Sequence, residues 1–460
     1  MILRETQGVQ WILQPDFAPY LDQLLGSTGE TVKESPVKRV SVHQVGVKRF
    51  YIKRYLHYAV PLRPLKYLVA PTQARQEWML ALRMEARGVP IVHHVALGER
   101  RSWRGVQESL LVTEEFAGQQ LDQIPNVEPS TVLAFVQRLH DLGALQHDLH
   151  PANVLVRKVP LEFRLVDLHG AELKDALTDS ERRDNLAMLR VSYPLPVSRE
   201  VAAQSRRLRR MLLFERSRRC LRHNRDFAPR AVGGLKWQVR LSGLTPAALA
   251  VLNGPDAFLA QRAQVLKAGR TSTVGKADGL VLKRFNFRKL QNLIKDLFRR
   301  SRARRAFRAA YHLELTGIPT ARPLAVASRR CCGVLLSSYL LMDEIPAACD
   351  LGTRLRNGPS PELSLVRAVG ELVAHLHEQG FSHRDLKETN LVLDGQGRLY
   401  LLDLDGLRFW GEIPERRAAS DLMRLARGLA AFPVVTVRHR VLFLLAYCHA
   451  RALKRVPREL

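Results

Sequence analysis

Cysteine is scarce in this chain, which has five cysteines among its 460 residues. They are Cys220, Cys331, Cys332, Cys349 and Cys448, and no two of them form a C-x-x-C pair. Structural zinc sites and disulfide frameworks both need regularly spaced cysteines. We therefore expect neither kind of site, and the composition fits a reducing compartment.

Long hydrophobic runs are missing as well. The best candidate for a membrane span, residues 441–447, is far shorter than the roughly 20 apolar residues that a spanning helix needs. Arginines flank this segment at positions 438, 440 and 451, so we expect a buried helix there. The first residues lack the pattern of a signal peptide. These observations favour a cytoplasmic protein.

Acidic residues are too few to balance the basic ones. The chain has 72 Lys and Arg against 44 Asp and Glu, which gives a formal net charge of +28. Such an excess favours anionic partners, namely nucleic acid, an anionic membrane surface or a phosphorylated substrate. The charge alone does not choose among them.

Two arginine-rich stretches concentrate this charge. The first comprises Arg206, Arg207, Arg209, Arg210, Arg216, Arg218, Arg219 and Arg222. The second comprises Arg299, Arg300, Arg302, Arg304, Arg305 and Arg308. Each stretch is either a solvated helix face or a surface that attracts anionic lipid headgroups. Nucleic acid is less favoured, because no aromatic stacking pattern accompanies the charge. We expect reversible contact with the inner face of the membrane.

An internal repeat organises the chain. Residues 139–153 and 376–390 share Leu, Gly, Asp and Asn at one constant offset. Three further pairs of blocks follow the same order. They are 52–55 with 282–285, 86–90 with 315–319, and 165–170 with 401–406. So long a period indicates a duplicated domain rather than a solenoid. We place the boundary at Gly233-Gly234, which predicts domains 1–234 and 235–460.

Each copy shows the same succession of secondary structure. Extended, β-rich segments such as residues 50–53 and 279–283 come first. A periodic helix follows and ends at Gly88 or Gly317, two residues before a proline. Another apolar strand comes next, and the remainder is mostly helical. The predicted fold class is α+β, with a small β-rich lobe and a helical lobe in each of two tandem domains.

The repeated polar residues match the needs of phosphoryl transfer from ATP. That reaction uses a lysine on the phosphates, a helix carboxylate that orients it, an Asp beside the acceptor, and an Asn and an Asp on Mg²⁺. The first copy supplies Lys53, Glu77, Asp148, Asn153 and Asp167. The second copy supplies Lys283, Asp385, Asn390 and Asp403. Its catalytic loop fits the pattern H-R-D-L-x-x-x-N.

Both copies resemble the protein-kinase-like superfamily and, within it, the bacterial lipopolysaccharide core kinases that phosphorylate Kdo or heptose. Residues 317–324 and the Leu-Asp-Leu-Asp motif at 402–405 carry the narrower resemblance. It implies an ATP- and Mg²⁺-dependent phosphotransferase acting on a lipopolysaccharide core sugar or a similar glycolipid. The alternatives are a protein or small-molecule kinase, and one active kinase domain regulated by a pseudokinase partner domain.

The resemblance also implies a role for each site residue. The groups that align or deprotonate the acceptor hydroxyl are Asp148 and Asp385. The groups at the nucleotide phosphates are Lys53, with Glu77 orienting it, Lys283 and Lys387. The Mg²⁺ ligands are Asn153, Asp167, Asn390 and Asp403. Asp405 is an alternative ligand, but the alignment of the repeats favours Asp403.

Several features depart from the kinase pattern. Neither copy has a G-x-G-x-x-G loop, so the cover of the phosphates is unexplained. Ala306 occupies the position of Glu77 in the second copy, and Glu314 lies about two turns too far along the helix to replace it. In the first copy the His-Arg pair reads Gln-His at 146–147. No A-P-E motif follows the Leu-Asp-Leu-Asp motif at 402–405, and this absence favours a small or glycolipid acceptor.

Overall fold

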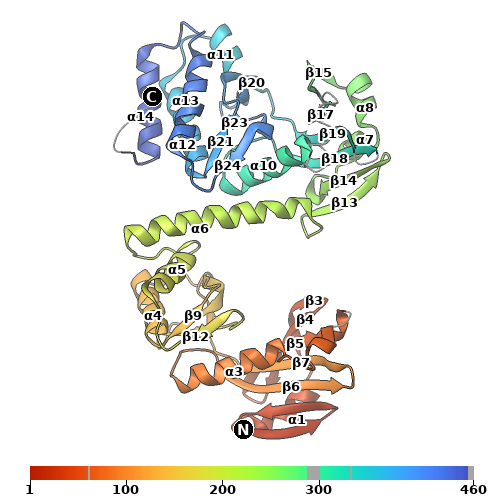
Figure 1. The fold of residues 1–460 in the computed structure, drawn as a ribbon, viewed down its shortest axis with the longest axis vertical. Coiled ribbons are helices and arrows are strands. Elements are labelled where there is room, and N and C mark those ends of the chain that lie inside the picture. Colours follow the sequence, from red (N-terminus) through yellow and green to blue (C-terminus); the bar gives the residue numbers. More distant parts are fainter. Residues whose placement is uncertain (61–62, 287–300, 332–333, 454–460) are drawn as a thin grey trace. The chain divides into compact units, whose positions relative to one another are not determined.

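The computed structural model describes residues 1–60, 63–286, 301–331 and 334–453 (Figure 1). The chain divides into two compact units, Met1–Leu208 and Arg209–Leu460, which are called domain 1 and domain 2 below. Each unit has a β-rich lobe followed by a helical lobe. The predicted α+β class with two tandem bilobal domains is therefore confirmed. Among the described helices, none is both long and apolar enough to cross a membrane.

The β-rich lobe of domain 1 is a seven-stranded antiparallel sheet in the order β1-β2-β6-β7-β5-β4-β3. Its strands are β1 (Ile2–Thr6), β2 (Val9–Leu13), β3 (Glu30–Ser35), β4 (Lys38–Val45), β5 (Lys48–Leu56), β6 (His94–Ser102) and β7 (Gly105–Glu114). Its α-helices are α1 (Leu21–Gly26), α2 (Arg63–Lys66) and α3 (Gln73–Ala86).

The helical lobe of domain 1 carries short strands that hold the polar loops. Its α-helices are α4 (Pro129–Asp141), α5 (Asp179–Arg190) and the first part of α6 (Arg199–Ser217). Its strands are β8 (Gln119–Gln120), β9 (Ala144–Gln146), β10 (Val154–Arg157), β11 (Glu162–Leu165) and β12 (Ala171–Leu173). Strands β8, β10 and β11 form one small sheet, and β9 pairs with β12.

Domain 2 repeats this arrangement strand for strand. Its large sheet has the order β13-β14-β18-β19-β17-β16-β15, the same path as in domain 1. Its strands are β13 (Phe227–Val232), β14 (Leu235–Arg240), β15 (Gln264–Ala268), β16 (Ser272–Ala277), β17 (Leu280–Phe285), β18 (Pro323–Cys331) and β19 (Val334–Asp343). Among the described residues, the α-helices of this lobe are α7 (Pro246–Asn253), α8 (Pro255–Ala257) and α10 (Arg302–Thr316).

The helical lobe of domain 2 is larger. Its α-helices are α11 (Leu351–Asn357), α12 (Leu363–Glu378), α13 (Glu415–Leu429) and α14 (Val437–Ala450). Its strands are β20 (Cys349–Asp350), β21 (Phe381–His383), β22 (Leu391–Leu393), β23 (Leu399–Leu401) and β24 (Leu407–Phe409). The apolar run at residues 441–447 lies within α14, so the predicted helix is confirmed. Its predicted burial is only partial, because Ala446 and Tyr447 are buried whereas Val441 and Leu445 are 50% and 61% exposed.

The division between the domains falls within α6, whereas the sequence predicted it at 234/235. Gly233 and Gly234 instead form the turn between β13 and β14, and both strands belong to the sheet of domain 2. Their φ values are +57° and +70°, which a two-residue hairpin turn of this type needs at both positions. The glycine pair therefore serves a tight turn rather than a linker.

One buried aromatic residue fixes the helix beside the sheet in each domain. Trp78 of α3 is 1% exposed and packs with Tyr55 and Leu97 of the sheet. Phe307 of α10 is fully buried and packs with Phe285 in the same way. Such side chains bury enough apolar area to contribute several kcal/mol at roughly 25 cal/mol per Å². The two helices therefore dock alike, and the residues before each aromatic, at 77 and 306, occupy equivalent places.

Candidate active site

In domain 1, Lys53 of β5 lies between two carboxylates. Its Nζ is 2.7 Å from Glu77 Oε1 on α3 and 3.3 Å from Asp167 Oδ1. Burial alone lowers the pKa of Lys53, but the charges of Glu77 and Asp167 outweigh burial and raise it. Burial also disfavours the Glu77 carboxylate, yet Lys53 and His94 hold the pKa of Glu77 well below its usual range. Lys53 and Glu77 are therefore both charged at neutral pH, as a phosphate-binding lysine requires.

The loop after β9 carries the next predicted residues. Asp148 is exposed, and its backbone N–H donates to the Gln146 side chain at 3.3 Å. Asn153 Nδ2 donates to the carbonyl oxygen of Asp148 at 3.0 Å, so the amide oxygen of Asn153 is left to bind a cation. Gln146 Nε2 donates to the carbonyl oxygen of Asp167 at 2.7 Å. The glutamine that replaces the usual histidine thus joins the two polar loops.

Both metal-motif aspartates have a left-handed backbone, with φ of +58° at Asp167 and +59° at Asp403. The residue before each aspartate donates its N–H to the carbonyl oxygen of Asn153 or Asn390, at 2.9 Å in both domains. The same backbone connection therefore brings the Asn and the Asp of each copy together. One carboxylate and one amide oxygen, completed by phosphates and water, suit Mg²⁺.

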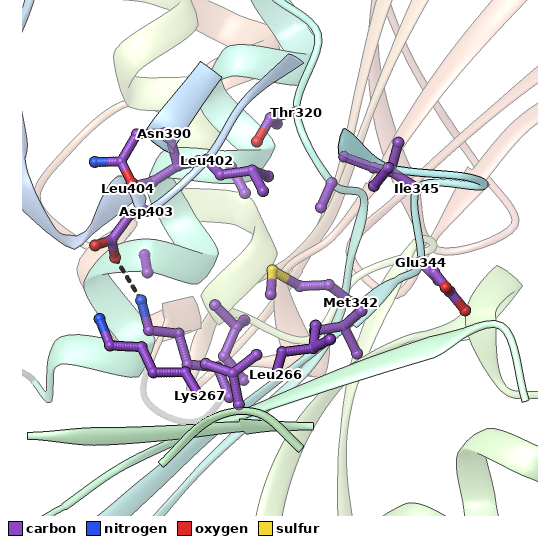
Figure 2. Close-up of a pocket in the computed structure, with 18 of the residues that line it drawn as sticks. Leu266, Lys267, Thr320, Met342, Glu344, Ile345, Asn390, Leu402, Asp403 and Leu404 are labelled. Atoms are coloured by element: carbon purple, nitrogen blue, oxygen red, sulfur yellow. Dashed lines mark hydrogen bonds and ion pairs between the residues drawn. The ribbon is translucent and has the colours of Figure 1, made fainter. Parts of the chain in front are cut away.

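In domain 2, a cavity of about 410 Å³ lies between the two lobes. Lys283, Lys387, Asn390 and Asp403 line it. Its apolar lining includes Leu266, Val274, Val281, Leu340, Met342, Ile345, Leu402 and Leu404. Figure 2 shows Asp403 at one end of the cavity and Ile345 toward the other. An apolar cleft with one charged end suits a ligand that combines a flat base with phosphates.

Lys283 of β17 has a different partner from its counterpart in domain 1. Its ammonium pairs with Asp403 (Figure 2). Burial alone raises the pKa of Asp403, but the charge of Lys283 outweighs burial and holds this pKa below its usual range. Ala306 of α10 lines the cavity where Glu77 would stand. Glu314 pairs instead with Arg240 at 2.6 Å, as its place further along the helix predicted.

A second ion pair of domain 2 was not predicted from the sequence. Arg302, the first residue of α10, donates from Nε to Asp405 Oδ2 at 2.7 Å. The two side chains are 23% and 12% exposed. The Arg302 guanidinium also lies 5.0 Å from the centre of the Phe285 ring. Asp405 is thereby turned toward α10 while Asp403 lines the cavity, which supports the choice of Asp403 as the metal ligand.

The catalytic loop of domain 2 is tied to α13. The N–H of His383 donates to the buried carboxylate of Asp421 at 2.7 Å, and the N–H of Asp385 donates to His383 Nδ1 at 3.3 Å. Asn390 Nδ2 donates to the carbonyl oxygen of Asp385 at 2.7 Å, which repeats the bond seen in domain 1. Lys387 Nζ lies 2.9 Å from Asp385 Oδ2. The loop therefore presents a lysine and a carboxylate side by side.

Two buried polar residues that support these loops were missed in the sequence. Asp421 is one, and Asn185 of α5 is its counterpart in domain 1. Asn185 Nδ2 donates to the carbonyl oxygen of Gln146 at 2.6 Å, and its Oδ1 lies 2.9 Å from His140 Nε2. Each is a polar residue directly before a leucine on the apolar face of a helix. That pattern was the available signal, because a polar group on a buried face needs a partner.

The structure brings the predicted residues together in both domains, with Ala306 as the one position that lacks its polar group. Each domain has a β-rich lobe and a helical lobe, and a lysine, an Asn and two Asp converge between them. This arrangement defines a protein-kinase-like fold. The chain belongs to the lipopolysaccharide kinase (Kdo/WaaP) family, whose model matches residues 23–210 and again residues 260–444. The two matches also confirm the tandem arrangement.

Curated relatives include 3-deoxy-D-manno-octulosonic acid kinases. The one from Vibrio cholerae serotype O1 is 27% identical over 128 residues, which is 28% of this chain and 53% of the relative. The one from Xylella fastidiosa (strain M23) is 31% identical over 106 residues, 23% of this chain and 41% of the relative. The chain thus spans about half the length of the curated relatives it matches.

Solved structures similar to this chain include WaaP in complex with acyl carrier protein, with a TM-score of 0.31 and 22% identity over 43% of this chain and 88% of that chain. Another is the bifunctional kinase-methyltransferase WbdD, with a TM-score of 0.27 and 15% identity over 40% of this chain and 43% of that chain.

Proposed function

We propose that this protein transfers the γ-phosphoryl group of ATP to a hydroxyl group of a lipopolysaccharide core sugar or a similar glycolipid. The observation that carries the proposal is the cavity of domain 2, where Lys283, Asn390 and Asp403 meet at one end of an apolar cleft. The family match in both repeats and the Kdo kinases among the relatives support a sugar acceptor.

The charged groups of the candidate site in each domain have distinct roles in this proposal. Lys53 and Lys283 bind the nucleotide phosphates, since each ammonium is held in place by a carboxylate of its own domain. Asn153 with Asp167, and Asn390 with Asp403, are the oxygen donors for Mg²⁺. A bound Mg²⁺ neutralises the charge that develops on the phosphate oxygens.

Asp385 is the group that receives the proton of the acceptor hydroxyl. As the proton leaves, the acceptor oxygen forms a bond to phosphorus, and the bond between phosphorus and the ADP oxygen breaks. Lys387, 2.9 Å from Asp385, stabilises the charge on the transferred group. Asp148 takes the same part in domain 1, where the next position but one is His150 rather than a lysine.

Purified protein with ATP, Mg²⁺ and Kdo-containing lipid A or heptose-containing core tests the proposal. Mass spectrometry of the glycolipid should show one added phosphate per acceptor. A protein that neither binds ATP nor phosphorylates any acceptor of this class would rule the proposal out. Transfer to a protein or to a free small molecule alone would support the alternative kinase class.

A second candidate is that domain 2 is a pseudokinase that regulates domain 1. Ala306 favours it, because Lys283 has no carboxylate on α10 to orient it. The cavity and the intact loop around Asp385 favour catalysis instead. Separate Asp148→Ala and Asp385→Ala variants decide between the two. Complete loss of phosphotransfer in the first and no loss in the second would establish a single active site in domain 1.

We also propose that the protein acts at the cytoplasmic face of an anionic membrane, where ATP is available. The exposed arginines of domain 2 on α6 and the turn after it support this. They are Arg209, Arg216, Arg218, Arg219 and Arg222. The second stretch is partly engaged within the fold, since Arg308 lies 4.1 Å from the Phe214 ring centre and donates to Ser217 at 2.9 Å. Its residues 299 and 300 lie outside the described part of the chain.

Liposome flotation tests this membrane contact. Each basic residue near an anionic surface contributes about 1 kcal/mol, so changing Arg209, Arg216, Arg219 and Arg222 to Gln should abolish most binding to anionic vesicles. The control carries the same charge change at Arg230, Arg367, Arg398 and Arg416, which are also exposed. Binding should also fall with salt, as the Debye length drops from about 10 Å at 0.1 M to about 3 Å at 1 M. Equal binding to neutral vesicles would contradict the proposal.

A further inference from the structure

Neither the β15–β16 hairpin of domain 2 nor the β3–β4 hairpin of domain 1 has the glycine-rich loop by which kinases cover phosphates. In domain 2 the β15–β16 hairpin contains Gly269 and Gly275. The N–H of Gly269 donates to Ser272 at 3.0 Å within the turn, and a Cβ at Gly275 would come within 2.8 Å of Ala263. These glycines therefore serve the turn and close packing. The β3–β4 hairpin of domain 1 contains no glycine.

A lysine on the edge strand faces the cleft of domain 2 instead. Lys267 of β15 pairs with Val274 of β16, which pairs with Lys283 of β17. A β-bulge just before Lys267 shifts the register by one residue, so Lys267 rather than Leu266 is the register partner of Val274. Residues directly opposite on neighbouring strands share one face of a sheet. The bulge therefore places Lys267 on the same face as Lys283.

Domain 1 repeats this feature at the same place. Lys33 of β3 follows a bulge, pairs with Val40 of β4, and Val40 pairs with Lys53 of β5. Lys38 lies on β4, the other strand of this hairpin, and the charges of the same two lysines affect it. Its pKa is lowered first by burial, then by the charge of Lys53 and, to a smaller extent, by that of Lys33. The charges of Lys53 and of Lys33 therefore both act on Lys38.

The lysine of domain 2 has no counter-ion among the described residues. Lys267 lines the cavity, and Figure 2 shows it extending toward the end where Asp403 lies. The other two lysines of this sheet that line the cavity are already paired, Lys276 with Glu344 and Lys283 with Asp403. Lys267 is exposed on its edge strand, so a cation that faces the cavity without a carboxylate is available to an anionic ligand.

We infer that Lys267 in domain 2 and Lys33 in domain 1 bind the terminal phosphates of the nucleotide in place of the backbone amides of a glycine-rich loop. The inference rests on the proposed function, because it requires ATP at the candidate site of each domain. A lysine is a point charge on a flexible stem and reaches a phosphate from a strand edge. Backbone amides must approach the phosphate closely, which is why they need glycine. The edge lysine therefore accounts for the missing loop.

Calorimetric titration of the full chain with ATP, ADP and AMP tests the inference. Lys267→Met, Lys33→Met and the double variant keep the apolar stem and remove the charge. Each single variant should weaken ATP binding at one site by about tenfold or more, since a hydrogen bond to a charged group is lost. AMP affinity should change less than about twofold. Lys267→Arg should retain most of the ATP affinity because it retains the charge.

Lys236→Met is the matched control, because Lys236 is an exposed lysine on β14 of the same sheet and does not line the cavity. It should leave all three affinities unchanged. An unchanged preference for ATP over AMP in the double variant would overturn the inference while ATP binding itself still supports the proposed function. An unaltered chain that binds no ATP would overturn both.

Discussion

The two domains share the strand order of the large sheet and the docking of one helix, α3 or α10, against it. The helix is linked to the loop that carries Asp167 or Asp403 in both domains, but the helix residue that makes the link is an anion in domain 1 and a cation in domain 2. In domain 1 the helix contributes an anion, Glu77, and Lys53 bridges it to Asp167. In domain 2 the helix contributes a cation, Arg302, which binds Asp405 directly. Both domains therefore keep a link between the helix and the loop with the metal-binding motif, but different residues make it.

Each domain lacks the residues that make the link in the other domain. Domain 1 has Gln73 where domain 2 has Arg302, and His169 where domain 2 has Asp405. Conversely, domain 2 has Ala306 in place of Glu77. In domain 2, Lys283 therefore depends on Asp403 alone among the described residues, while α10 holds the metal loop two residues further along.

The largest expected effect is on phosphotransfer, and it tests whether both domains are catalytic. Asp148→Asn and Asp385→Asn should each lower the phosphotransfer of its own domain by about 10²–10⁴-fold, because proton acceptance is lost while the shape is kept. If both domains are active, each single variant keeps part of the total rate and the double variant keeps none. Steady-state assays of the four proteins measure this. Asp122→Asn, at an exposed position, should behave like the unaltered chain.

The next effect concerns the shared docking of the helices. Trp78→Ala and Phe307→Ala should each lower the free energy of unfolding of their domain by about 3–5 kcal/mol, because each leaves a large cavity in a buried cluster. Urea denaturation of the full chain would show one of its transitions shifted. Trp78→Phe gives domain 1 the aromatic of domain 2 and should cost less. Equal losses for Trp78→Phe and Trp78→Ala would contradict the packing argument.

A smaller effect separates the domains by pH. The pKa of Glu77 is lower in the folded protein than in the unfolded chain, so its contribution to stability is complete above about pH 4.5 and declines as the pH falls below that value. Glu77→Gln should destabilise domain 1 at pH 7, and this difference should shrink on acidification by at most about 1.4 kcal/mol per pH unit. Denaturation at pH 7, 5 and 3 checks the trend.

Ala306→Gln is the matched variant of domain 2 for that experiment, since it adds an amide where domain 2 lacks the carboxylate. The stability difference that it causes should not vary with pH. A Glu77→Gln difference that stayed constant or widened toward pH 3 would show that the carboxylate of Glu77 is not held charged by Lys53.

The smallest expected effect is the coupling energy of the ion pair between Arg302 and Asp405, which is specific to domain 2. Arg302→Gln and Asp405→Asn, singly and together, form a double-mutant cycle, and the pair should show a coupling of about 1–2 kcal/mol because it is partly buried. The single variants should lower kcat more than they raise KM for ATP, since they loosen the loop that carries Asp403. Arg302→Lys should restore part of kcat. Additive effects of the two changes would refute the pairing.

The sequence predicted more of the site than of its supports. The repeated D-x4-N and the strand aspartates placed Asp148, Asp385, Asp167 and Asp403 correctly in their loops, because their spacing is set by short local turns. The link between Arg302 and Asp405 joins residues about a hundred positions apart, and no local pattern records such a contact. The bulge before Lys267 escaped for a similar reason, since register depends on the neighbouring strand. The domain division was displaced because a glycine pair fits a hairpin as well as a linker.

The left-handed backbone at Asp167 and Asp403 has a consequence for selection. An aspartate pays roughly 1 kcal/mol for that conformation, which glycine adopts freely. A change to glycine would remove this cost, but in domain 2 it would also leave the ammonium of Lys283 without its carboxylate. Glycine at 403 should therefore destabilise domain 2 unless Lys283 is changed with it, so selection for stability alone would keep or lose this lysine and this aspartate together.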